Sequence, residues 1–172
     1  ITAIQSIATM QPRNFTDYAQ AANQGNYLII SHPNLHTGDV DQVERYALYR
    51  NSQQGGSYNT LVVDINQLYD QFAWGIDKNP LSIQNFINYA MDIWDKKPDY
   101  LLLLGKSIQY SDFRLNPNTY AKCLVPSYGH HASDVMLSAR NIDNYVNQLS
   151  TGRIPAQTPN DVRAYLDKII QH

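Results

Sequence analysis

The sequence has little cysteine, little charge and no long apolar run. Its 172 residues include a single cysteine, so no internal disulfide can form, and 16% of them are charged, with a net charge of −2. Without a run of lysines or arginines, nothing favours a nucleic acid or an anionic membrane as a partner. No apolar run reaches the roughly 18 residues of a membrane span. What remains is a globular chain rich in uncharged polar residues, including 13 tyrosines.

The length suits one domain with a core large enough to fold without disulfides or metals. Uncharged polar surfaces of this kind are common in exported proteins. The chain opens with "ITAIQ" and has no initiator methionine, so we expect it to be a piece of a longer protein. The lack of a recognisable signal peptide is then uninformative.

Short apolar runs predict three buried strands, at residues 26–31, 58–65 and 99–105. The last of them, within "DYLLLLG", has no polar face, as expected of a central strand in a parallel sheet. A helix is expected after the first strand, with Thr37 or Asp39 as its N-cap. Its predicted apolar face consists of Val40, Val43, Ala47 and Leu48.

Two further helices have clearer apolar faces. One ends before Pro98 and presents Ile83, Phe86, Ile87, Ala90, Met91 and Trp94 at helical spacing. The other begins with Thr158 as N-cap, Pro159 at the first helical position and Asp161 at the third. Its predicted apolar face consists of Val162, Tyr165, Leu166, Ile169 and Ile170.

Alternating strands and helices predict an α/β fold, a Rossmann-like three-layer domain with a mostly parallel sheet and helices on both faces. Residues 1–25 are expected to form a helical lead-in, and residues 106–147 to be irregular. Loops that follow strand carboxyl ends are where α/β folds place their functional sites.

The segment "CLVPSYGHHASDVML" at 123–137 concentrates the reactive side chains. Cys123 with His130 or His131 would make a thiol–imidazole pair if the thiolate lay beside the base. However, "AKCLVP" predicts a short strand around Cys123, where a lone cysteine is usually a small buried hydrophobe. Ser133 and Asp134 have the composition of a turn or an N-cap. The residues alone leave the function of this loop open.

No metal or cofactor is expected. Adjacent residues on an extended segment point in opposite directions, so His130 and His131 cannot readily share an ion. The spacings HExxH and CxxC, typical of zinc sites, are absent. His32 and His36 would add ligands only if the fold brought them close. "LLLLGKSIQ" places Gly-Lys-Ser after a strand but lacks the earlier glycine of a phosphate-binding loop.

Four segments, in order, resemble the gingipain-type cysteine peptidases, peptidase family C25. They are "DINQLYDQFAWGIDKNPLSIQNFINYA", "WDKKPDYLLLLGKSIQYSDFR", "VPSYGHHASDVML" and "STGRIPAQTPNDVRAYLDKIIQH". The most specific parts are Tyr69-x-x-Phe72-x-x-Gly75 and the stretch Gly152-Arg153-Ile154-Pro155. Within the family, the chain is most similar to secreted or surface members associated with type IX secretion.

This resemblance implies a caspase-like fold and a non-catalytic role. Gingipain-like enzymes have two caspase-like subdomains in sequence, and their His–Cys dyad belongs to the second. Residues 26–172 resemble the first, so the resemblance implies a catalytic second subdomain after residue 172. The partners would be that subdomain and a peptide or protein substrate, at a bacterial cell surface or outside the cell. An isolated chain would be inactive.

The resemblance assigns no catalytic residue to this chain. It makes His130, His131, Ser133 and Asp134 candidates for a loop near the substrate cleft. Cys123 would be structural, and Arg153 would order the loop by pairing with Asp134 or Asp143. Relatives commonly have Gly-Asp where this chain has Gly105-Lys106, so no binding role is carried over to Lys106.

Two other functions stay open. The chain could be a non-enzymatic surface binding or assembly module that keeps the α/β scaffold and uses its loops to hold a protein. Less favoured is a self-contained hydrolase that uses Cys123 with His130 or His131.

Overall fold

The computed structural model describes residues 14–171, which form a parallel sheet covered by helices. The strands are β1 (Tyr27–Ser31), β2 (Thr60–Asp64), β3 (Tyr100–Leu104) and β6 (Ser150–Ile154), in the order β2-β1-β3-β6 and all parallel. β3 lies inside the sheet, and Leu102 and Leu103 are 6% and 0% exposed. The predicted central strand is therefore confirmed.

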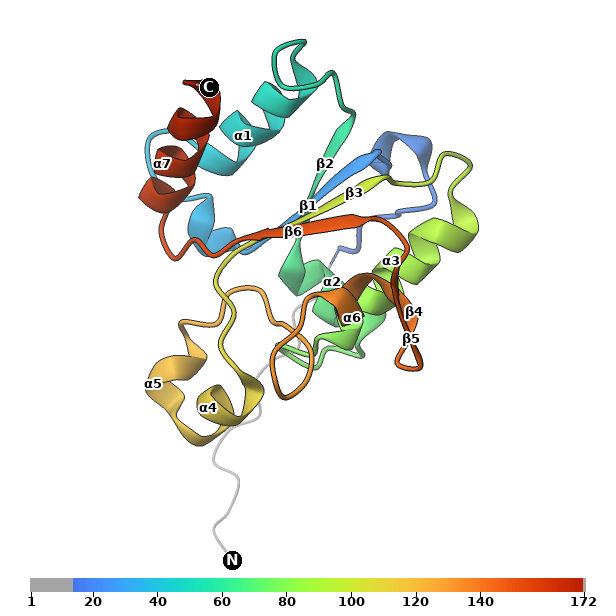
Figure 1. The fold of residues 1–172 in the computed structure, drawn as a ribbon, viewed down its shortest axis with the longest axis vertical. Coiled ribbons are helices and arrows are strands. Elements are labelled where there is room, and N and C mark those ends of the chain that lie inside the picture. The colour runs from blue at the N-terminus through green and yellow to red at the C-terminus, as the bar shows by residue number, and fades with distance from the viewer. Residues whose placement is uncertain (1–13, 172) are drawn as a thin grey trace, which may run out of the picture.

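Helices cover both faces of the sheet (Figure 1). α1 (Gln42–Asn51) and α7 (Pro159–Ile170) lie on one face, and α2 (Ile65–Phe72) and α3 (Leu81–Ile93) lie on the other. The strands contribute alternate residues to two core clusters, one under each helical layer. The predicted three-layer α/β fold is confirmed. Within the described residues no helix is long and apolar enough to cross a membrane.

Helix α3 follows the predicted pattern closely. Five of the six expected core residues, Ile83, Phe86, Ile87, Ala90 and Trp94, are 0% exposed, and Met91 is partly buried against them. The regular helical spacing of apolar residues on one face makes this helix predictable, because burying that face on the sheet supplies most of the helix's stability.

Helix α1 begins later than predicted, and its predicted face is partly wrong. The N-cap is Asp41, whose side chain accepts hydrogen bonds from the backbone N–H groups of Val43 and Glu44. Val40 therefore precedes the helix and is 56% exposed, and Leu48 is 66% exposed. The buried face consists of Val43, Tyr46 and Ala47.

Helix α7 has the predicted capping box, in which Thr158 and Asp161 bond each other's backbone N–H groups. Only the inner part of its predicted face is buried. Val162 and Leu166 are fully covered, whereas Tyr165 and Ile170 are 44% and 49% exposed. The outer apolar positions therefore reach solvent, beside the edge strand β6.

The predicted helical lead-in is wrong where it can be checked. Residues 1–13 lie outside the described part, and residues 14–25 contain only a short 3-10 turn at Ala21–Asn23. Asp17 bonds the backbone N–H of Ala19, and the Asn23 amide bonds the carbonyl of Asp17. Such local side-chain bonds compete with helix formation.

The segment 106–147 has more structure than predicted. It contains three short helices, α4 (Tyr110–Leu115), α5 (Pro117–Tyr120) and α6 (Val135–Ser138), and a hairpin of β4 (Ala139–Asn141) and β5 (Asn144–Asn147).

The predicted strand around Cys123 is absent. The Cys123 N–H closes a turn on Tyr120, and Leu124 and Val125 both donate to the single carbonyl of Lys106. Without a row of partners, this segment crosses the end of the sheet as irregular backbone.

Candidate functional site

Three loops meet beside the carboxyl edge of the sheet. They are residues 76–80 between α2 and α3, the connection after β3 that contains α4 and α5 (residues 109–120), and residues 127–130 before α6. In Figure 1 the chain leaves β3 at this edge and runs into α4 and α5. Ligand sites of open α/β sheets occupy this position because the loops that follow parallel strands converge there.

The loops enclose two adjoining hollows, which we call the aromatic groove. The larger has a volume of about 600 Å³ and the smaller about 340 Å³. Residues that line both hollows are Lys78, Pro80, Tyr110 and Phe113. The larger is completed chiefly by Ile76, Arg114, Pro117 and Tyr120, and the smaller by Ser127, Tyr128, Gly129 and His130. Both volumes fall within the usual range of small-ligand and peptide side-chain pockets.

Lys78 is the unusual residue of the groove. It is 8% exposed, and its Nζ donates a hydrogen bond of 2.6 Å to the carbonyl oxygen of Cys123. The ammonium also lies 4.3 Å from the ring centroid of Tyr120, a cation–π distance. Its backbone is left-handed, with φ of 56°, which non-glycine residues seldom adopt. A buried cation in a strained backbone is typical of a site rather than of a surface loop.

Tyr120 closes one side of the groove. Its hydroxyl donates to Oδ2 of Asp77, and its ring packs against Phe113 at 5.7 Å. Partial burial and the hydrogen bond to Asp77 raise the pKa of Tyr120 to about 12. The hydroxyl therefore stays protonated at neutral pH and occupies one oxygen of the Asp77 carboxylate.

The loop 127–134 forms the wall of the smaller hollow. Tyr128 and Ser133 pair as an isolated antiparallel bridge, with hydrogen bonds of 3.1 and 2.8 Å between their backbones. The turn between them is made possible by Gly129, whose φ is 80°. Of the two histidines, both exposed, His130 lines the hollow.

Arg153 fastens this loop to the sheet. It lies within β6, and its guanidinium pairs with both oxygens of Asp134 at 2.7 and 2.8 Å. It also donates to the carbonyl oxygens of Gly105, Val125 and Pro126 at 2.7, 2.8 and 3.1 Å. The side chain is only 12% exposed. One arginine therefore ties the ends of β3 and β6 to the wall of the groove.

Asp143, the other expected partner of Arg153, lies elsewhere. It occupies the exposed turn between β4 and β5, where its backbone N–H donates to the side chain of Asn141 at 3.0 Å. Asp134 occupies the N-cap position of α6 but makes no capping hydrogen bond, because Arg153 holds its carboxylate.

Cys123 is 0% exposed and forms no pair with a histidine. Burial raises the pKa of the Cys123 thiol. A hydrogen bond with the Ile108 backbone and the positive charges of Lys78 and Arg153 act in the opposite direction but do not cancel this rise. His130 and His131 are exposed on the neighbouring loop. A nucleophilic cysteine needs the opposite environment, with an accessible thiol whose pKa is lowered.

We expect Cys123→Ala to cost roughly 1 kcal/mol of stability at pH 7, as small buried losses do. The pH dependence of the free energy of unfolding should change as well. In the unfolded chain the thiol ionises near pH 8.5, whereas in the folded chain burial keeps it protonated to higher pH. The contribution of the thiol to the stability of the fold is therefore present below about pH 8.5 and is lost as the pH rises above that value. Urea unfolding at pH 7.5 and 9.5 measures this. The variant should lose less stability than the wild type over that interval, and an equal loss would contradict the assignment.

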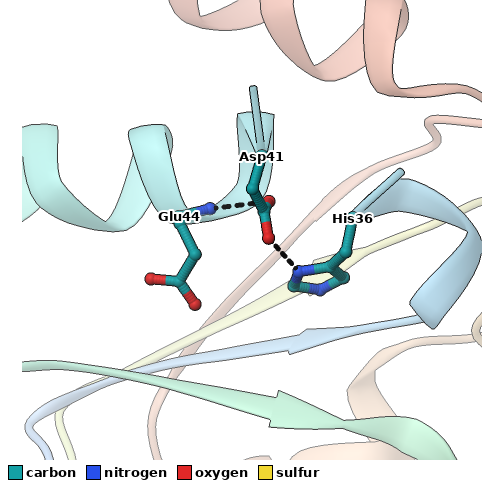
Figure 2. Close-up of side chains that lie close together, drawn as sticks. All are labelled: His36, Asp41 and Glu44. Carbon is teal, nitrogen blue, oxygen red and sulfur yellow. Dashed lines mark hydrogen bonds and ion pairs between the residues drawn. The ribbon is translucent and has the colours of Figure 1, made fainter. Parts of the chain in front are cut away.

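A second polar cluster joins β1 to α1. Ser31 Oγ lies 2.7 Å from Nε2 of His36. On the other side of the ring, His36 Nδ1 lies 2.7 Å from Oδ2 of Asp41, as Figure 2 shows. The order Ser–His–Asp is that of serine hydrolases. Ser31 is 0% exposed, however, so no substrate can reach its hydroxyl.

The same cluster brings ligand atoms of His36, Asp41 and Glu44 within 4.8 Å of one another. Both ring nitrogens of His36 are already hydrogen-bonded, and Asp41 Oδ1 caps α1. A cation would have to displace these bonds. The cluster therefore serves as a connection between the strand end and the helix N-terminus.

The groove residues were not predicted from the sequence. Lys78, Tyr110, Phe113 and Tyr120 come from two separate segments, and only the fold brings them together. The run of aromatics at 110, 113 and 120 between β3 and Cys123 was the one available signal. Of the predicted loop residues, His130 reaches the groove, whereas Asp134 acts through Arg153.

The layers, the parallel sheet and the loops gathered at its carboxyl edge define a caspase-like α/β domain. The sequence profile of peptidase family C25 matches residues 20–172, so the chain belongs to that family and the predicted resemblance is confirmed. No curated protein sequence matches this chain.

The fold is also similar to the crystal structure of dimeric latent PorU from Porphyromonas gingivalis. The TM-score is 0.65 at 20% sequence identity, over 86% of this chain and 15% of that one. At this identity the similarity concerns the fold. The chain spans less than a fifth of that protein's length.

Proposed function

We propose that this chain is the N-terminal, non-catalytic subdomain of a gingipain-like C25 cysteine peptidase. In this role it supports the catalytic half and contributes loops to the substrate cleft. The second subdomain of the longer protein, after residue 172, then supplies the His–Cys dyad. Resemblance to secreted members associated with type IX secretion favours a place at the bacterial surface or outside the cell.

The state of Cys123 is the observation that carries this proposal. Within a family of cysteine peptidases, the chain's one thiol is completely buried and its pKa is raised. Peptide cleavage needs a thiolate, an imidazole and oxyanion donors within hydrogen-bond reach of a substrate. A buried neutral thiol meets none of these requirements.

The arrangement of the loops supports a role in the cleft. His130 and Tyr128 lie in a wall that Arg153 and Asp134 hold rigid, at the edge of the sheet where α/β folds bind ligands. Loops there touch a substrate without taking part in the chemistry. We place Ser133 and His131 in the same wall, as shaping rather than catalytic residues.

A thiol-directed covalent peptidase probe and a broad peptide library test the proposal on the purified chain. We expect neither labelling nor cleavage, and Cys123→Ala should behave as the wild type does. Cleavage that disappears in both Cys123→Ala and His130→Ala would instead establish a self-contained hydrolase.

Exposed apolar residues favour the alternative of a binding or assembly module. Trp74 is 81% exposed and has a left-handed backbone with φ of 55°, and Ile76 and Leu115 are 55% and 83% exposed. Ile76 lines the aromatic groove, and exposed apolar side chains mark contact surfaces where they form a contiguous patch. They fit a protein partner whether or not that partner is a catalytic subdomain, and the natural sequence after residue 172 separates the two functions.

A further inference from the structure

We propose that the aromatic groove binds an extended peptide segment in which an internal aspartate or glutamate is flanked on both sides by apolar residues. The inference rests on the proposed function and deepens it, because it names the class of peptide that this half of the cleft takes. Its basis is the pairing of two apolar hollows with a buried ammonium between them.

The walls of the hollows are apolar and rigid. Tyr110 and Phe113 pack edge to face at 5.3 Å, and Phe113 packs in the same way on Tyr120 at 5.7 Å. Pro80, Pro117 and Ile76 add apolar surface to the larger hollow. Aromatic and proline walls of this kind bind extended peptides at low entropic cost, since the groove is already formed.

The charges select an acidic peptide. Within residues 14–171 neither the Lys78 ammonium nor the Arg114 guanidinium pairs with a carboxylate, although both line the larger hollow. Asp77, the acidic residue of that lining, already accepts the Tyr120 hydroxyl. Lys78 has three N–H donors, and among residues 14–171 its hydrogen-bond acceptor is the Cys123 carbonyl. A peptide carboxylate would supply the missing acceptor.

The position of Lys78 favours an internal acidic residue over a chain terminus. Lys78 and Pro80 line both hollows, so an anion bound there has an apolar hollow on either side. A terminal carboxylate would fill one hollow and leave the other empty. A segment with apolar side chains before and after the acid fills both.

Fluorescence anisotropy with the purified chain tests this. The probe is a labelled ten-residue peptide with a central Phe-Glu-Leu among serines, compared with peptides that carry Gln or Lys in place of Glu. We expect the Glu peptide to bind about ten- to a hundredfold more tightly than the Gln peptide, because it gains a charge-assisted hydrogen bond. The Lys peptide should bind more weakly still.

Two groove variants and a control locate the binding. Arg114→Glu and Tyr110→Ala should each weaken binding of the Glu peptide by about tenfold or more. Arg163→Glu makes the same charge change as the first on the exposed side of α7, away from the groove, and should leave binding unchanged. Thermal unfolding of each variant shows whether it is folded.

Equal binding of the Glu and Gln peptides, or equal loss in the groove and control variants, would overturn the inference. The inference would also be overturned if the peptide binds this chain but not the proposed longer protein, because another part of that protein would then cover the groove. The assay does not depend on catalysis. Absent binding therefore leaves the proposed function standing, and a reactive Cys123 would overturn that function without touching the peptide site.

Discussion

Replacing Arg153 by alanine is expected to lower the free energy of unfolding by about 3 kcal/mol, because a partly buried ion pair and three hydrogen bonds to carbonyls are lost together. The Asp134 carboxylate, 30% exposed, would lose its bidentate partner. The carbonyls of Gly105, Val125 and Pro126 would lose a donor at the same time. Urea unfolding followed by circular dichroism measures the change. Arg153→Lys should recover little of it, because an ammonium cannot reproduce the planar fork.

Arg140→Ala is the matched control. Arg140 also forms a bidentate pair, with Asp92 at 2.8 and 2.9 Å, but the two side chains are 46% and 52% exposed. Water screens such an exposed pair, so its loss should cost far less stability than the loss of Arg153. Equal effects of the two substitutions would show that Arg153 does not fasten the loop as described.

Trp94→Ala is the second substitution with a large expected effect, about 3–5 kcal/mol, as for other buried aromatic side chains. Trp94 is 0% exposed, packs on Phe86 at 6.0 Å and donates from its indole N–H to the carbonyl of Tyr18 at 2.7 Å. The ring thereby attaches the N-terminal segment to α3. Trp94→Phe keeps most of the packing but removes the indole donor and leaves the Tyr18 carbonyl only the longer 3.4 Å hydrogen bond from Gln24 Nε2, so we expect an intermediate loss of stability.

Trp74 supplies the control for Trp94. It is 81% exposed, so Trp74→Ala should change the stability by no more than about 0.5 kcal/mol. Chemical unfolding of both variants under one set of conditions gives the comparison. A loss for Trp74→Ala as large as that for Trp94→Ala would mean that Trp74 packs on the domain and is not part of a contact surface.

The elements that could be predicted from the sequence are those whose signals are local and agree with one another. β3 is a run of leucines between Tyr100 and Gly105, and α3 repeats its apolar residues on one face through three turns. In α7, Thr158 and Asp161 mark the start of the helix before its apolar face begins. In each case the local signals present in the segment favour the same structure, and in α7 they include the capping box.

The start of α1 could not be predicted from the same signals. Thr37, Asp39 and Asp41 are all suitable N-caps within five positions. Asp41 is the one used, because it also meets His36 at the end of β1. That contact depends on how the strand and the following turn pack together. Tertiary packing therefore determines which of the three residues caps the helix.

The site was only partly predictable for the same reason. Arg153 was expected to pair with Asp134 or Asp143, and the structure has the pair with Asp134, 19 positions away in the sequence. Lys78 gave no signal, although it is the buried cation of the groove. Its position depends on a left-handed backbone that favours glycine or asparagine, and nothing in the sequence indicates that a lysine adopts it.

The proposed longer protein, with its second subdomain after residue 172, would provide the most direct test of the proposed non-catalytic role. It would be labelled with the thiol-directed peptidase probe, digested, and the labelled peptide identified by mass spectrometry. We expect the label on a cysteine that follows residue 172, with activity unchanged to within a few-fold in Cys123→Ala, because the Cys123 thiol is buried and its pKa is raised. A label on Cys123, lost together with the activity in Cys123→Ala, would contradict the account.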